Sequence, residues 1–384
     1  MIKLLETRPV VTYDPPKPQY DRRDLASQIQ DRLDSLTKPR ASLGALECLA
    51  RDIGVILGTT EPEIVRPHLL IFAGDHGITE EGVSLYPQDV TGQMVRNFLT
   101  GGAAANVFAK LHNVDVSVID AGIVDQSSIE APSGIRCEGS EAIRFVPASI
   151  GPGTRNFLHS PAMTLAEAEK ALAVGASLVK DLVTSGTNTV LIGEMGIGNS
   201  SSAALITACL TKSPLADCIG RGTGLENKAM AHKVTLLDRA LKRPQEALSN
   251  PMKVACEFGG FEIIMMAGAY MAAATHGCVA IADGYISSAA LLLAEKLRPG
   301  SIDSVIFSHR SRERGHSLQL SQWQKRPLLD LDLALGEGTG ALLALPLLRA
   351  ACAMLRDMAT FESAAVSQAL LPQNTLLSKE GSDP

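Results

Sequence analysis

The sequence predicts an α/β protein with a doubly wound, mainly parallel sheet, helices on both faces of that sheet, and a smaller helical domain from the chain ends. Three observations predict this fold. Short apolar runs recur along the chain and end in Gly or Asp, and longer segments of helical pattern separate them. The short runs are apolar throughout instead of alternating, which is typical of strands buried on both faces of a parallel sheet.

The apolar runs define five expected strands, at 69–73, 114–119, 189–192, 278–282 and 304–307. The helical patterns between them cover residues 90–111, 165–185, 201–211, 227–242, 261–274 and 287–297. A segment near 125–160 is rich in Pro, Gly and Ser, and we expect an irregular excursion or a hairpin there. Ligands bind at the carboxyl ends of parallel strands, so the polar clusters that follow these runs should share one pocket.

The two ends of the chain are helical in pattern and contain no expected strand, over residues 20–57 and 338–367. We therefore expect an N-terminal helical segment (1–60), an α/β nucleotide-binding domain (61–335) and a C-terminal helical segment (336–384). The two end segments are expected to pack together as the small domain.

Composition excludes several classes of protein. The net charge of −6 over 384 residues argues against nucleic acid as a partner. Seven scattered cysteines without a CxxC pair indicate neither a disulfide framework nor a zinc cage. The first 24 residues contain charges and prolines but no apolar core of signal-peptide length. Residues 263–282 carry no charge, but His276-Gly277 divides them into a helix and a strand, so they are expected to be buried. A soluble, cytoplasmic protein without a membrane segment is expected.

The strongest chemical signal is the run from Gly193 to Ser202, which leads from a strand into an apolar helix. Glycines at such a junction let backbone N–H groups approach a phosphate, and the helix N-terminus favours its negative charge. Asn199 stands where a P-loop has its lysine, so the run favours a monophosphate over a nucleoside triphosphate. The alternative is a tight strand-to-helix turn without a ligand.

Two further glycine clusters precede helices. Gly220–Gly224 precedes the helix that carries Lys228 and Lys233; either lysine could reach a phosphate or be a solvated surface charge. Glu337 stands between glycines in the second cluster, where a ligand could approach closely. The alternative for Glu337 is an acidic residue stabilised by a helix dipole.

A competing function is a metal-dependent phosphohydrolase. Asp75 and His76 follow the first strand and could bind a metal, with His309 and Asp283 completing the site. A closed metal site requires three or four ligands, and the spacing of these residues does not demand one. A nucleotide-sensing protein without catalysis is a third possibility.

Taken in order, these clusters resemble the nicotinate-nucleotide–dimethylbenzimidazole phosphoribosyltransferase family. The resemblance covers roughly residues 25–360. It rests on Lys38-Pro39 with Ser42-Leu43-Gly44-Ala45-Leu46-Glu47, then Asp75-His76-Gly77, then Glu194-Met195-Gly196-Ile197-Gly198-Asn199, and finally Gly336-Glu337-Gly338-Thr339-Gly340. Each motif is weak alone, but the ordered set is specific.

The resemblance implies a role for each matching position. Glu337 matches the general base that takes a proton from the benzimidazole. The positions that match phosphoribosyl and nucleotide contacts are Glu194, Gly196, Gly198, Asn199, Ser200, Gly222, Lys233, Asp283 and Ser311. Those that match the base pocket are Tyr86, Gln93, Met195 and Leu335. The family acts without a metal or another cofactor, as homodimers, on nicotinate mononucleotide and a benzimidazole base.

Two departures from the family pattern stand out. Arg40-Ala41 replaces a usual Pro-Gly, so a different local turn is expected there. Tyr86 is larger than the small residue found in some relatives, so the preferred base could differ from dimethylbenzimidazole.

Overall fold

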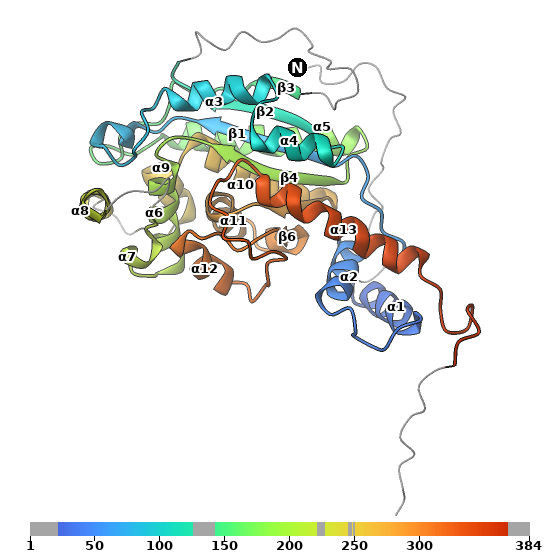
Figure 1. Cartoon of the computed structure of the whole chain (residues 1–384). Helices are drawn as coiled ribbons and strands as arrows, with labels where there is room; N and C mark the ends of the chain where they lie inside the picture. Colours follow the sequence, from blue (N-terminus) through green and yellow to red (C-terminus); the bar gives the residue numbers. More distant parts are fainter. Residues whose placement is uncertain (1–21, 126–142, 221–226, 245–247, 249, 368–384) are drawn as a thin grey trace, which may run out of the picture.

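The computed structural model describes residues 22–125, 143–220, 227–244, 248 and 250–367 (Figure 1). Its centre is a six-stranded sheet in which every pair of neighbours is parallel. The strands are β1 (His68–Gly74), β2 (Asp115–Gly122), β3 (Ile143–Pro147), β4 (Thr189–Met195), β5 (Val279–Ala282) and β6 (Val305–Phe307). Their order, β3-β2-β1-β4-β5-β6, reverses direction between β1 and β4, which confirms the doubly wound prediction.

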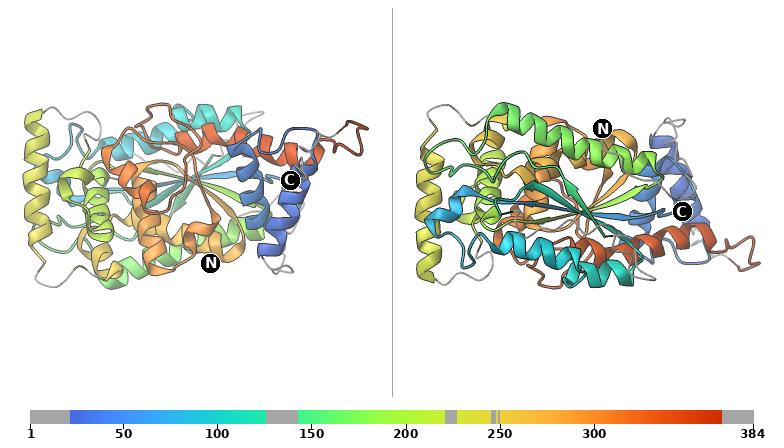
Figure 2. Two further views of the ribbon diagram at one scale, coloured as in Figure 1. Left: turned by 90° about the horizontal axis from the view of Figure 1, so that it is seen from below. Right: turned by 90° about the horizontal axis from the view of Figure 1, so that it is seen from above.

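Helices cover both faces of the sheet, and alternate strand residues face them. On β1, Leu70 and Phe72 join the apolar core beneath one helical layer, while Leu69 and Ile71 join the core beneath the other. The first layer contains α5 (Leu165–Thr184), α6 (Asn199–Thr211), α10 (Phe261–His276) and α11 (Tyr285–Leu297). The second contains α3 (Val90–Leu99), α4 (Ala104–Leu111) and α13 (Thr339–Asp357). Figure 2 shows the sheet between these layers.

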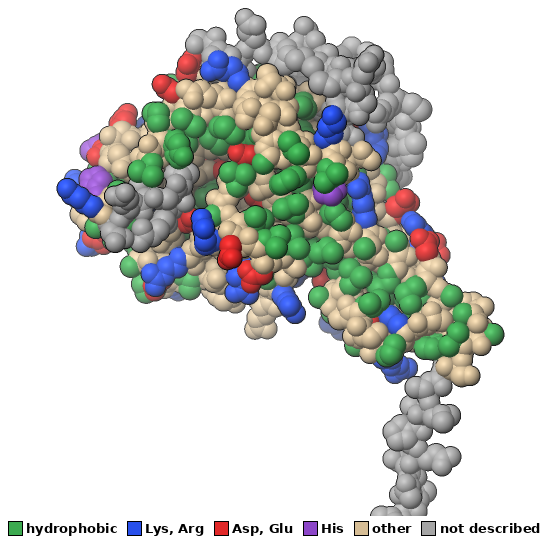
Figure 3. All heavy atoms as spheres, in the orientation of Figure 1, with side chains coloured by type: hydrophobic (Ala, Val, Ile, Leu, Met, Phe, Trp, Pro, Cys, Tyr) green, Lys and Arg blue, Asp and Glu red, His purple; other side chains and the backbone are tan. Residues whose placement is uncertain are grey.

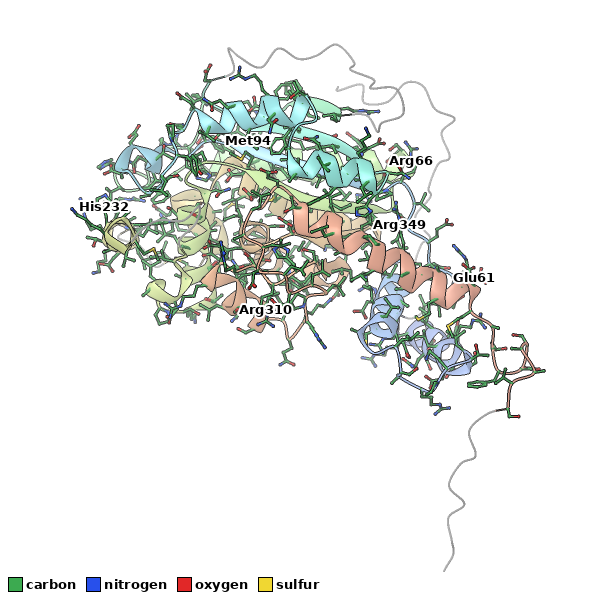
Figure 4. All side chains as sticks on the ribbon, in the orientation of Figure 1. Glu61, Arg66, Met94, His232, Arg310 and Arg349 are labelled. Atoms are coloured by element: carbon green, nitrogen blue, oxygen red, sulfur yellow. The ribbon has the colours of Figure 1, made fainter. Side chains whose placement is uncertain are left out.

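Helices α1 (Arg22–Ser35) and α2 (Ala45–Leu57) lie at one end of the molecule beside α13, and α8 (Asn227–Lys242) lies at the other end (Figure 2). The apolar side chains of α1 and α2 belong to the same buried cluster as those of α13 and of one sheet face. Arg349 of α13, labelled in Figure 4, donates from Nη1 to the carbonyl of His112 at 2.9 Å. The hydrogen bond joins α13 to the end of α4, and the shared apolar cluster joins the first and last described helices. The division into two domains stays a prediction.

The shorter helices stand near the edges of the first layer or beside the loops that follow the strands. They are α7 (Leu215–Cys218), α9 (Pro251–Phe258), α12 (Arg314–Ser321), and two 3-10 turns at Gly77–Glu81 and Ser301–Ser304. Sequence patterns did not predict α7, α9 or α12, each of which has eight residues or fewer.

Two predicted elements were wrong in detail. Strand β3 lies inside the segment expected to be irregular or a hairpin; only Val146 of its five residues is fully buried, so it lacks the apolar run of the central strands. The single helix expected at 90–111 is two helices, because Thr100 ends α3 and Gly101 turns the chain with a φ of 81°.

The uncharged segment 263–282 is buried in α10 and β5, as predicted. Within the described residues, one helix, α13, is long and apolar enough to cross a membrane, and 61% of its apolar window is buried. Its side chains Leu342, Leu345 and Leu348 are fully buried against the sheet and α2, so α13 is a core helix.

The turn that departs from the family pattern is held by a buried ion pair. Lys38 Nζ lies 2.9 Å from Glu47 Oε1, which also accepts a hydrogen bond from the backbone N–H of Leu43. Within this turn Ala41 has a φ of 57°, in the left-handed region that favours glycine.

Ala41→Gly should therefore stabilise the protein. Relief of the left-handed alanine is worth about 1–2 kcal/mol, and the greater freedom of glycine in the unfolded chain removes about 0.4–1 kcal/mol of that gain. Urea denaturation should show a rise of about 0.5–1 kcal/mol in the free energy of unfolding. Ala173→Gly, on the exposed face of α5, is the control and should lower that free energy by about 1 kcal/mol. A loss of stability in Ala41→Gly would contradict the argument.

Candidate active site

A cleft opens at the carboxyl ends of β4, β5 and β6. It encloses about 900 Å³, including the space at its open mouth. Its wall is built from the loops after these three strands, from α8 and from the segment before α13. The predicted site residues that line it are Glu194, Met195, Gly196, Gly198, Asn199, Ser200, Lys233, Asp283, Ser311 and Leu335. Residues from distant parts of the sequence thus meet around one cavity, as expected for polar clusters at strand ends.

The glycine turn between β4 and α6 requires its glycines. A Cβ on Gly196 would lie 2.5 Å from the carbonyl oxygen of Gly74, and Gly198 has a φ of 95° at the N-cap of α6. Thr91 Oγ1 accepts the backbone N–H of Ile197 at 3.1 Å and so fixes the turn from α3. The turn therefore places the N-terminus of α6 at the cleft, where the helix dipole favours an anion.

Lys233 is the buried cation of the cleft. Only 1% of its surface is exposed, and its Nζ donates to Ser200 Oγ at 2.9 Å. Burial lowers the pKa of Lys233 to about 8, and the nearby Glu313 opposes this shift. The other candidate on α8, Lys228, is exposed. Figure 4 labels His232, the neighbour of Lys233, and Arg310, the neighbour of Ser311 in the loop after β6.

Glu194, at the end of β4, is a buried acid. Burial raises the pKa of Glu194 to about 8, with the charges of Asp283 and Glu262 acting in the same direction. Asn199 Nδ2 donates to Glu194 Oε2. At neutral pH Glu194 is therefore mainly protonated and acts as a polar wall of the cleft, not as a second negative charge.

Glu337 stands in the loop before α13 and is 5% exposed. It accepts a hydrogen bond from the backbone N–H of Ala105 in α4, while its Oε2 is buried without a hydrogen-bond partner among the described residues. Burial raises the pKa of Glu337 to about 7, the charge of Asp283 raises it too, and the Ala105 N–H opposes them. A carboxyl with a free buried oxygen and a pKa near neutrality suits a general base.

Some predicted residues lie away from this wall. Glu337 is adjacent to the lining residue Gly336 but does not itself line the cleft. Tyr86 is 49% exposed and Gln93 is exposed, and neither lines it. Gly222 lies outside the described residues. Their roles stay predictions.

Other lining residues were not singled out from the sequence. They are Val83, Ser84, Glu313 and Ala334, with Ile286 and Ser287 at the start of α11. Glu313 stands two positions after Ser311 and Ala334 one before Leu335, so proximity to a predicted residue was the available signal.

The residues of the alternative metal site each contact a different partner. Asp75 Oδ2 accepts the N–H of Val124 at 2.9 Å, and His76 Nε2 pairs with Glu262 Oε1 at 2.6 Å beneath the glycine turn. His309 Nδ1 lies 3.8 Å from Asp283 Oδ1 in the cleft. In the part of the chain that the structure describes, no three His, Cys, Asp or Glu side chains are placed to hold a metal ion.

The chain matches known proteins over most of its length. A family model described as "Phosphoribosyltransferase" matches residues 19–366. The nicotinate-nucleotide–dimethylbenzimidazole phosphoribosyltransferase of Dechloromonas aromatica is 46% identical, over 89% of this chain and 96% of its own. The protein of that name from Cupriavidus necator is 47% identical, over 90% and 96%.

The structural comparison agrees with the sequence comparison. The crystal structure of CobT from Thermus thermophilus has a TM-score of 0.84 to this chain at 42% identity, covering 90% of this chain and all of that one. A second structure from the same organism, of a protein named nicotinate-nucleotide–dimethylbenzimidazole phosphoribosyltransferase, has a TM-score of 0.80 at 41% identity, covering 90% of this chain and 99% of that one. This chain belongs to the nicotinate-nucleotide–dimethylbenzimidazole phosphoribosyltransferase family.

Proposed function

We propose that this enzyme transfers the 5-phosphoribosyl group of nicotinate mononucleotide to 5,6-dimethylbenzimidazole, giving α-ribazole 5′-phosphate and nicotinate. The observation that carries the proposal is the meeting of a glycine turn and a buried lysine at one cleft, with the buried Glu337 next to the lining residue Gly336, in a chain of this family. The relatives' names supply the two substrates. A cytoplasmic location follows from the same proposal.

The phosphate of the nucleotide binds at the turn containing Gly196 and Gly198. The Ser200 hydroxyl and the Lys233 ammonium are its donors, and the N-terminus of α6 favours its negative charge. Ser311 binds elsewhere on the nucleotide, and Asp283 lies beside it. The aromatic base lies beside Met195 and Leu335, and the family resemblance assigns Tyr86, before α3, and Gln93, in α3, to the same base.

In the reaction, one benzimidazole nitrogen uses its lone pair to form a bond with the anomeric carbon. The bond from that carbon to nicotinate breaks, and its electron pair neutralises the pyridinium nitrogen, so the leaving group needs no acid. The proton on the second benzimidazole nitrogen passes to the Glu337 carboxylate. Attack from the face opposite the leaving group inverts the anomeric carbon from β to α.

Lys233→Met should raise the KM for nicotinate mononucleotide by about 10- to 100-fold, because a charge-assisted hydrogen bond to phosphate is worth about 1.5–3 kcal/mol. The kcat should change much less, because the phosphate does not take part in the bond changes. Initial-rate kinetics would measure both values. Lys228→Met, on the exposed face of the same helix, is the matched control and should leave both unchanged. Equal effects of the two substitutions on KM would contradict the assignment of Lys233 to the phosphate site.

The reaction itself is tested by incubating the purified protein with both substrates in the presence of EDTA. Chromatography should show free nicotinate and a new ribosyl phosphate in equal amounts. Release of nicotinate only with another aromatic base would keep the mechanism and change the acceptor. Phosphate release that requires a metal would instead support the phosphohydrolase alternative with Asp75, His76 and His309.

We further propose that the enzyme is a homodimer. Figure 3 shows hydrophobic side chains gathered on the face that carries α4 and α13. On α4, Val107 and Leu111 are 58% and 69% exposed and add to this apolar surface, and a contiguous apolar surface is typical of a protein–protein contact. Light scattering coupled to size exclusion should give a mass near twice 40.6 kDa. A mass of one chain would contradict the proposal.

A further inference from the structure

We propose that Asp283 is a positioning residue, which acts through the start of α13 to hold Glu337 in place for proton transfer. This inference rests on the proposed function and goes beyond the resemblance, which places Asp283 only beside the nucleotide. Asp283 follows β5 and is 2% exposed at the floor of the cleft.

The carboxylate of Asp283 caps α13 from 55 residues away in the sequence. Its Oδ1 accepts the N–H groups of Gly340 at 2.7 Å and Ala341 at 3.2 Å, and its Oδ2 accepts the N–H of Gly338 at 3.2 Å. The residue at the N-cap of α13 is Gly338, which has no side chain to satisfy these donors. Asp283 therefore replaces the missing cap, on the residues immediately after Glu337.

The loop needs such an anchor because its backbone is unusual. Gly336, Glu337 and Gly338 have φ values of 85°, 62° and 78°, three left-handed residues in succession. For Glu337 this conformation is costly and persists only where the surroundings hold it. From the other side, Gly193 allows close approach: a Cβ there would lie 2.5 Å from the nitrogen of Gly338. The loop thus packs closely against β4 on one side and donates hydrogen bonds to Asp283 on the other.

Asp283 also sets the charge that surrounds Glu337. Among the described residues, the ionisable groups that face Glu337 are Asp283 after β5 and Glu194 on β4, and His309 lies behind Asp283. The packed helix α4 contributes the backbone N–H of Ala105. Burial raises the pKa of Asp283, but three N–H donors and His309 favour its carboxylate form. Burial is the largest cause of the raised pKa of Glu337, and the charge of Asp283 adds to it.

The test is Asp283→Asn, which keeps the shape of the side chain but loses one acceptor oxygen and the charge. Because a small misplacement of a catalytic group can cost about 10²-fold, kcat should fall about 10- to 100-fold, while the KM for nicotinate mononucleotide stays within about threefold. The acidic limb of the pH profile should move to lower pH. Asp283→Glu keeps the charge but displaces the carboxylate, so it should lose kcat without moving that limb. Circular dichroism and thermal melting check that both variants fold.

The decisive comparison is a double-mutant cycle with Glu337→Gln in a single-turnover assay. If Asp283 acts through Glu337, adding Asp283→Asn to Glu337→Gln should cost less than about twofold. An undiminished loss in that background, or a rise in KM with kcat unchanged, would overturn the proposal and make Asp283 a direct nucleotide ligand.

If the proposed function is wrong, the wild-type protein will show no turnover, which distinguishes that failure from a failure of the inference about Asp283. The effect of Asp283 on the pKa of Glu337 can then still be measured without substrate. Carbon NMR can follow the Glu337 carboxyl, assigned by its loss in Glu337→Gln. Its pKa should fall in Asp283→Asn, and an unchanged pKa would count against the proposal.

Discussion

Glu337→Gln should lower kcat by about 10²–10⁴-fold, the range that a general base contributes. The amide keeps the size of the side chain and its ability to accept the Ala105 N–H, but it cannot take a proton. Binding of nicotinate mononucleotide should remain within about threefold, because the glycine turn, Ser200 and Lys233 are untouched. Rapid-mixing kinetics and calorimetric titration would give the two values. Glu337→Asp, which keeps a carboxylate one methylene further away, should recover part of the rate. A Gln variant with most of its activity would remove Glu337 from the mechanism.

The same residue predicts the pH dependence of kcat/KM. Glu337 must be ionised to act as a base, and its pKa is raised to about 7, so the rate should fall as pH drops below about 7. Lys233 must be protonated to bind phosphate, and its pKa is lowered to about 8, so the rate should fall again above about 8. In the wild type, kcat/KM should therefore show a narrow bell-shaped dependence on pH between these limits. Glu337→Gln should lose the acidic limb and Lys233→Met the alkaline one.

Gly175→Ala should lower the free energy of unfolding by about 3 kcal/mol, near the upper end of the usual cost of overpacking. Gly175 of α5 faces the backbone of α10, and a Cβ there would lie 1.8 Å from the carbonyl oxygen of Met265. The contact is reciprocal, since a Cβ on Gly268 of α10 would lie 2.1 Å from the carbonyl oxygen of Leu172. The two helices touch backbone to backbone, and neither can accept a methyl group without separating.

Urea denaturation would measure this loss. Gly151→Ala is a suitable control, because the nearest atoms to a Cβ there are on the Phe261 ring at 3.8 Å and the backbone is not left-handed. The control should change stability by about 0.5 kcal/mol or less. A Gly175 variant as stable as the control would show that α5 and α10 can move apart freely.

The central strands were predictable because burial on both faces demands uninterrupted apolar residues, as in Leu69 to Ala73. Edge strand β3 was not, since Ile143, Arg144 and Phe145 are only half buried and lack that pattern. The helix break at Gly101 follows from a positive φ, which glycine permits but does not require.

The order of the polar clusters along the sequence predicted most of the site, because ten of the predicted residues line the cleft. The hydrogen bonds from the start of α13 to Asp283 could not be predicted from the sequence, because no spacing rule links residues 55 positions apart. The contact of His76 with Glu262 could not be predicted either, since Glu262 lies in the first turn of a mostly apolar helix, 186 positions further along the chain.

The order of the helices along the chain has a consequence for synthesis of the protein on the ribosome. Helix α13 is the last described helix, yet its side chains cover Leu69, Leu191 and Ile281 in the sheet, and Glu337 stands directly before it. Until Asp357 has left the exit tunnel, a nascent chain has all six strands but an open apolar surface. Such an exposed surface favours chaperone binding, and the proposed base Glu337 then lacks the helix that follows it. Completion of the hydrophobic core is thus a late event, and under the proposed mechanism the placement of Glu337 belongs to the same step.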